Sequence, residues 1–142
     1  MLWLKQRGRW VYCLNMYRFN WINYYNLSKK LKEDKNYNDN NLREATLRTI
    51  LSRTYYAFLI YLRNHLQETE NVEFPEDKSL HKQLIEFLKE NKDKKKRKIG
   101  NRMERLMSNR NYADYTNQIE GTFYKVRESL RTAEELVNLL NL

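Results

Sequence analysis

The segment Leu42–Glu68 reads LREATLRTILSRTYYAFLIYLRNHLQE and decides the fold of this chain. Its apolar residues recur at intervals of three and four, which is the spacing of one face of an α-helix. These residues are Leu47, Ile50, Leu51, Tyr55, Phe58, Leu62 and Leu66. Because no Gly or Pro interrupts the segment, it predicts a single helix of about seven turns.

Shorter helical patterns lie on both sides of this segment. They predict helices over about residues 19–33, 79–91, 101–114 and 122–140. The apolar residues of the first are Phe19, Ile22, Leu27 and Leu31, together with Tyr24 and Tyr25. Breaks between these helices are expected at residues 34–41, at residues 69–78 around Pro75, at the lysine run 92–98 with Gly100 after it, and at residues 116–121. With no candidate strand, the expected fold is all-α, an up-and-down bundle of about five helices.

Composition narrows the class of protein. The 142 residues suit one domain, and three Gly and one Pro are too few for the turns of an all-β fold. The single cysteine, Cys13, excludes an internal disulfide and fits a reducing cytoplasm. No apolar run approaches the roughly 20 residues that span a bilayer. We therefore expect a soluble cytoplasmic protein without membrane contact.

The first fifteen residues differ from the remainder. They are basic and carry Trp3 and Trp10, but they lack the features of a signal peptide. Met16 directly precedes the first helical pattern, so we interpret residues 1–15 as an extension upstream of the native start and residues 16–142 as the domain. The alternative is a short extra helix that packs the two tryptophans on the body.

Positive charge is concentrated in two places. The net charge of the chain is +9. Residues 1–32 contain seven Lys or Arg and no acid, and the lysine run at 92–98 has a net charge of +5. Concentrated positive charge suits a polyanion. The candidate RNA- or phosphate-binding residues of the run are Lys94, Lys95, Lys96 and Arg97. The alternative is that the run is a solvated loop.

Two motifs carry most of the functional information, SRTYYA at 52–57 and RNYADY at 110–115. Taken alone, Arg110 and Asp114 can form an ion pair along one helix face, and the two tyrosines of SRTYYA can be core residues. Together with FNW at 19–21, Ala45 and Arg48 before SRTYYA, and His81 between the motifs, they resemble the HEPN domain (higher eukaryotes and prokaryotes nucleotide-binding). The similarity is to its small stand-alone prokaryotic branch and covers about residues 19–140.

The resemblance implies a helical bundle that forms a homodimer, and that works beside a minimal nucleotidyltransferase or in defence and toxin–antitoxin modules. Many relatives are metal-independent ribonucleases that use an Arg, the polar residue after it, and a His four to six residues beyond the Arg. Arg110 and Asn111 match the first two of these. Tyr115 stands where the histidine is expected, and His81 replaces it as base only if the fold brings it to Arg110.

The replacement of the histidine matters because RNA cleavage by the 2′-hydroxyl needs a base that titrates near neutrality. A phenol titrates near 10, so forming its anion at pH 7 costs about 4 kcal/mol. Moreover, residues five apart on an unbroken helix lie about 140° apart, so Arg110 and Tyr115 converge only if the helix ends near Asp114.

Three functions follow from these observations. The first is a HEPN protein that binds RNA or nucleotide phosphate through Arg53, Arg110, Asn111 and Tyr115, flanked by the lysine run. The second is an active metal-independent ribonuclease toxin, and the third is a non-catalytic dimerisation or interaction module. The sequence contains no Gly-rich phosphate loop and no metal-ligand spacing of Cys or His, so no cofactor is expected.

Overall fold

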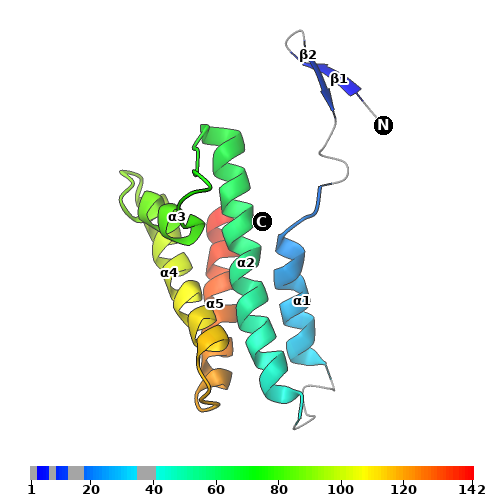
Figure 1. Cartoon of the computed structure of the whole chain (residues 1–142), viewed down its shortest axis with the longest axis vertical. Coiled ribbons are helices and arrows are strands. Elements are labelled where there is room, and N and C mark those ends of the chain that lie inside the picture. The colour runs from blue at the N-terminus through cyan, green and yellow to red at the C-terminus, as the bar shows by residue number, and fades with distance from the viewer. Residues whose placement is uncertain (1–2, 7–8, 13–17, 35–40) are drawn as a thin grey trace.

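The computed structural model describes residues 3–6, 9–12, 18–34 and 41–142, and these form a two-stranded hairpin and five helices (Figure 1). The elements are β1 (Trp3–Gln6), β2 (Arg9–Tyr12), α1 (Ile22–Glu33), α2 (Arg43–Glu70), α3 (Leu80–Lys89), α4 (Lys94–Tyr115) and α5 (Thr122–Leu140). The predicted all-α bundle of five helices is confirmed. The helices predicted over 42–68 and 122–140 correspond closely to α2 and α5.

The long helix α2 is the centre of the bundle. It packs against α1 on one side and against α4 and α5 on the other, whereas α3 packs chiefly on α4. Buried side chains from all five helices form one core, among them Tyr25, Phe58, Leu84, Met103 and Leu136. Removing this apolar surface from water is the main force that holds the helices together. Within the described ranges, no helix has both the length and the apolar character needed to cross a membrane.

The start of α4 differs from the prediction. The lysine run is not a loop, because α4 begins at Lys94 and continues through Gly100 without a break. Asp93 caps this helix: its carboxylate accepts a hydrogen bond of 2.9 Å from the main-chain N–H of Lys95. Gly100 lies where α4 meets α3, and a Cβ there would come within 3.0 Å of Leu88 Cβ. The glycine therefore permits close helix packing instead of ending a helix.

The first helix buries only part of the predicted apolar set. It begins at Ile22, whose main-chain N–H donates a hydrogen bond of 3.1 Å to the Asn20 side chain. The predicted core residues Phe19 and Leu27 are 50% and 45% exposed. Tyr25, which is also among the predicted residues, is buried: its ring packs on Phe58 and its hydroxyl donates to Glu134 of α5 at 2.9 Å.

Two expectations about the N-terminal residues are wrong: that the chain has no strand, and that residues 1–15 could form a helix. β1 and β2 pair antiparallel, with Trp3 opposite Tyr12 and Gln6 opposite Arg9. The aromatic and β-branched residues of this stretch favour a strand over a helix. Figure 1 shows the hairpin beyond the N-terminal end of α1, apart from the bundle. The predicted start at Met16 and the predicted turn over 35–40 lie outside the described residues.

Candidate functional site

Arg110 projects from the last turns of α4 between two aromatic rings. Its guanidinium carbon lies 5.1 Å from the ring centre of Tyr56 on α2 and 5.8 Å from that of Tyr115. Nη2 donates a hydrogen bond to the Tyr56 hydroxyl, and Nη1 donates to Asn111 Oδ1 at 3.1 Å. Nε lies 2.8 Å from Asp114 Oδ2. These contacts hold the guanidinium in one orientation.

The guanidinium nevertheless keeps donors for a ligand. It carries five N–H groups, and the bonds to Tyr56 and Asn111 use one from each Nη atom. The second N–H of each Nη atom has no acceptor among the described residues. Nε is buried and makes no hydrogen bond, because its contact with Asp114 is an ion pair without hydrogen-bond geometry. An anion beside the two Nη atoms would supply acceptors for their remaining N–H groups.

The fold brings His81, the second residue of α3, into the same group of side chains. Its ring lies 5.5 Å from that of Tyr55 at an interplanar angle of 15°, and it meets Tyr56 edge-on at 6.0 Å. The Tyr55 hydroxyl lies 2.7 Å from His81 Nδ1. We call this set the Arg110 cluster; it consists of Arg110, Tyr115, Tyr56, Tyr55 and His81.

Two members of the cluster have shifted pKa values. Burial lowers the pKa of His81 from its usual 6.5, and the positive charge of Arg110 lowers it further. Burial raises the pKa of the Tyr55 hydroxyl, although the charge of Arg110 opposes this effect. At neutral pH the imidazole is therefore neutral and the phenol keeps its proton.

Arg110 and Tyr115 meet although α4 is helical through both residues. Tyr115 is the last residue of α4, and its side chain is 77% exposed. The next residue, Thr116, is extended, so the helix ends directly after Tyr115. Arg110 and Tyr115 thus converge, as expected for a helix that ends near Asp114, with the guanidinium carbon 5.8 Å from the centre of the ring.

A family model described as HEPN domain matches residues 26–142. The chain belongs to the HEPN domain family. The match contains the whole Arg110 cluster and excludes the N-terminal hairpin. No curated protein and no solved structure matches the chain.

Two sets of predicted site residues of this HEPN domain lie away from Arg110. Arg53 precedes Tyr56 by one turn of α2, but its guanidinium packs 5.0 Å from the ring centre of Tyr24 on α1. The lysine run forms the first turns of α4, about 20 Å along the helix axis from Arg110. The run therefore does not line the Arg110 site within one chain, and its part in RNA binding stays a prediction.

Two members of the lysine run form contacts within the protein. Lys96 forms an ion pair with Glu70 of α2. Arg97 folds back and donates to the main-chain oxygens of Asn91 and Lys92 at 2.8 and 2.7 Å. Lys94 and Lys95 are exposed. Lys92 and Lys98 are exposed as well, so these four lysines are the members of the run most available to a polyanion.

A second arginine, Arg48, shapes the site of this HEPN domain, although from the sequence it carried only part of the resemblance and no role. Arg48 on α2 donates to the main-chain oxygens of Ala113 at 2.8 Å and Gln118 at 2.9 Å, and it also donates to that of Thr116. It therefore holds the end of α4 that carries Tyr115. The sequence does contain a hint that Arg48 faces the bundle. Arg48 lies seven residues, or two helical turns, before the buried Tyr55 and so faces the same side of α2.

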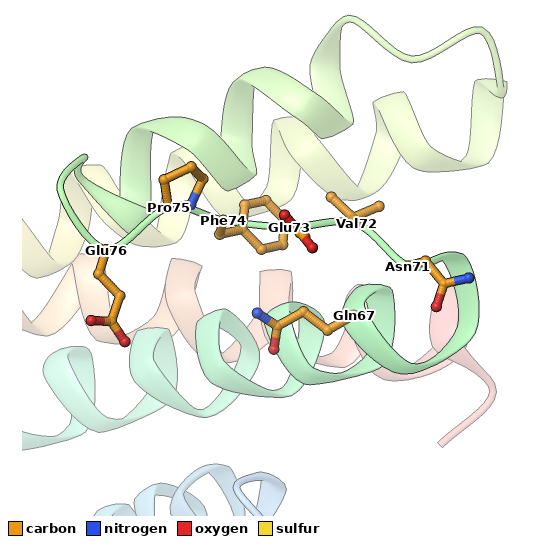
Figure 2. Close-up of a pocket in the computed structure, with 7 residues that line it drawn as sticks. All are labelled: Gln67, Asn71, Val72, Glu73, Phe74, Pro75 and Glu76. Carbon is orange, nitrogen blue, oxygen red and sulfur yellow. The ribbon is translucent and has the colours of Figure 1, made fainter.

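A pocket of about 550 Å³ lies elsewhere, between the end of α2 and the segment that follows it (Figure 2). Gln67 faces this segment across the pocket, and Glu73 and Glu76 contribute carboxylates to its lining. Because carboxylates repel a phosphate, this pocket does not suit a nucleotide phosphate. The Arg110 cluster is the better candidate for a phosphate.

Proposed function

We propose that this HEPN domain protein binds RNA or a nucleotide through a phosphate group at the Arg110 cluster. The observation that carries the proposal is the guanidinium of Arg110, which is oriented by Tyr56 and Asn111 and keeps a free N–H on each Nη atom. A planar guanidinium with donors on both Nη atoms matches the oxygens of a phosphate. Since its orientation is set before binding, little entropy is lost when the ligand arrives.

Tyr115 extends the proposal from a phosphate to a nucleotide. Its ring is 77% exposed and lies beside the guanidinium of Arg110. An exposed aromatic ring next to a phosphate-binding arginine offers a surface on which a base can stack, and such stacking contributes about 1–3 kcal/mol per base. The phosphate and the base of one nucleotide would then contact Arg110 and Tyr115 together.

A metal-independent ribonuclease is the second candidate. One observation favours it: His81 touches Tyr56 and so belongs to the Arg110 cluster, although it comes from a different helix than the family histidine. Against it, the position five residues after Arg110 is a tyrosine, whose phenol is a poor base at neutral pH.

We further propose that the protein acts as a homodimer in a module with a minimal nucleotidyltransferase, or in a defence or toxin–antitoxin system. The family resemblance supports these partners. The start of α1 supports a dimer, because Phe19 is half exposed beside Trp21 and Tyr24. Contiguous exposed aromatic surface is typical of protein interfaces. Light scattering should give twice the monomer mass of 17.6 kDa at micromolar concentration.

The experiment for the proposed function is a titration with a fluorescent single-stranded oligoribonucleotide in EDTA. Arg110→Ala should weaken binding about tenfold or more, because it removes charged hydrogen bonds. Arg102→Ala is the matched control: Arg102 lies two turns earlier on α4 and forms an ion pair with Glu135 outside the cluster. This control should lose similar stability but no affinity.

Two outcomes would change the conclusion. If Arg110→Ala lowers the melting temperature but leaves RNA affinity unchanged, Arg110 is only a structural partner of Asp114 and the proposed site is wrong. If the wild-type protein shortens the RNA in EDTA and Arg110→Ala does not, the ribonuclease is the correct function.

A further inference from the structure

We infer that Tyr55 fixes His81 as the neutral tautomer with its proton on Nε2, so that His81 donates a hydrogen bond to the bound phosphate and does not act as a base. The inference rests on the proposed phosphate site and assigns a role to its histidine. It makes His81 a ligand-binding residue and Tyr55 a positioning residue.

The direction of the Tyr55–His81 hydrogen bond carries the argument. Tyr55 is completely buried, and its hydroxyl lies 2.7 Å from His81 Nδ1. No other acceptor for this hydroxyl exists in the described part of the chain. If Nδ1 carried a proton, the buried O–H of Tyr55 would be left without an acceptor, which is unfavourable. Tyr55 therefore donates and Nδ1 accepts.

The accepting role of Nδ1 determines the other nitrogen. A neutral imidazole carries one proton, so a ring whose Nδ1 accepts has its proton on Nε2. His81 is half-buried, and its Nε2 forms no hydrogen bond within the described residues. Arg110 from α4, and Tyr55 and Tyr56 from α2, are the ionisable groups that face the ring, and burial and Arg110 both disfavour its charged form.

The cluster then presents donors from three helices. Arg110 supplies N–H groups, and the Tyr56 hydroxyl accepts from Arg110 and keeps its own proton to donate. His81 adds Nε2–H. An Nε2 that carries a proton has no lone pair with which to remove the proton of a ribose 2′-hydroxyl. The arrangement suits a ligand group that only accepts hydrogen bonds, as a phosphate does.

The first measurement needs no ligand. Nitrogen-15 NMR of the histidine ring distinguishes the two tautomers, and a His65→Gln background leaves His81 as the sole histidine. The expected spectrum shows a protonated Nε2 and an unprotonated Nδ1, and Tyr55→Phe should convert it to a mixture of tautomers. A protonated Nδ1 in the parent protein, or an unchanged spectrum in Tyr55→Phe, would overturn the inference.

The second measurement is binding of inorganic phosphate and of a short 5′-phosphorylated oligoribonucleotide. His81→Gln places an amide N–H near the position of Nε2 and cannot act as a base, whereas His81→Leu has no donor. We expect His81→Gln to bind within about threefold of wild type and His81→Leu to bind about tenfold more weakly. Equal losses in both variants, or wild-type RNA cleavage that His81→Gln abolishes, would refute the donor role.

The two proposals fail in different ways. If Arg110→Ala retains full RNA affinity, the proposed function fails, but the tautomer of His81 still decides whether Tyr55 orients the ring. If Arg110→Ala loses affinity and the NMR spectrum shows a proton on Nδ1, the phosphate site stands and the role of His81 is wrong.

Discussion

The guanidinium of Arg48 donates a hydrogen bond of 2.8 Å to the main-chain oxygen of Ala113, 65 residues further along the chain. The last carbonyls of a helix have no partner within the helix, and here an arginine from α2 supplies one for α4. Glu44 completes the arrangement: it accepts from Arg48 Nε at 2.9 Å and from the Thr122 hydroxyl at 2.8 Å. Arg48 therefore joins α2 to the end of α4 beside Tyr115.

Replacing Arg48 by Ala should lower the free energy of unfolding by about 2–3 kcal/mol, because half-buried carbonyls would lose a charged donor. Urea denaturation measures this change. Arg63→Ala is the control, since among the described residues the Arg63 side chain bonds only to its neighbour Asn64, and it should change stability by less than about 0.5 kcal/mol. Equal effects of the two substitutions would show that Arg48 does not anchor α4.

Gly100→Ala should destabilise the protein by about 1–3 kcal/mol, although Ala is the better helix former by about 1 kcal/mol. The reason is the close approach of α3, where the added Cβ would lie 3.0 Å from both Leu88 Cβ and the main-chain nitrogen of Lys89. Thermal unfolding of this variant beside Asn101→Ala, an exposed position on the same helix, tests the prediction. A more stable Gly100→Ala protein would contradict the close contact between α3 and α4.

The lowered pKa of His81 predicts a pH dependence of stability. Below pH 6.5 the unfolded chain binds a proton at this residue more readily than the folded chain, whose ring faces Tyr55, Tyr56 and Arg110. The contribution of His81 is therefore complete above about pH 6.5 and is lost as the pH falls from there to the folded-state pKa.

Urea midpoints between pH 5 and pH 8 test this dependence. The fall in stability on acidification should be smaller in His81→Gln than in wild type. It should be unchanged in His65→Gln, whose exposed ring lies against Tyr61. If the urea midpoint of His81→Gln falls with pH as steeply as that of the wild type, other groups account for the pH dependence.

The lysine run should affect long RNA and not short ligands, because it lies about 20 Å from Arg110 along α4. Replacing Lys94, Lys95 and Lys96 by Gln should reduce the slope of log affinity against log salt by up to about two for a single-stranded RNA of some twenty nucleotides. Lys96 should contribute least, since it is paired with Glu70. A mononucleotide cannot span the distance and should bind these variants unchanged; an unchanged slope for the long RNA would make the run a solvated surface.

Local sequence determined the helices themselves. Apolar spacing located α2 and α5 to within two residues of their ends, because amphipathic periodicity depends only on near neighbours along the chain. The order of the motifs also indicated the HEPN family before any contact was known. The start of α4 was missed because a run of lysines predicts a loop, whereas the Asp93 cap and the packing of Gly100 on α3 favour a helix.

Only the tertiary structure decided the composition of the site. Arg110 contacts Tyr56, which is 54 residues away in the sequence, and Tyr55 contacts His81, which is 26 residues away. Both contacts depend on how α3 and α4 pack against α2, and helical periodicity says which face of a helix is buried but not which helix covers it. The same packing placed the lysine run at the far end of α4 and brought Arg48 to the carbonyls that end it.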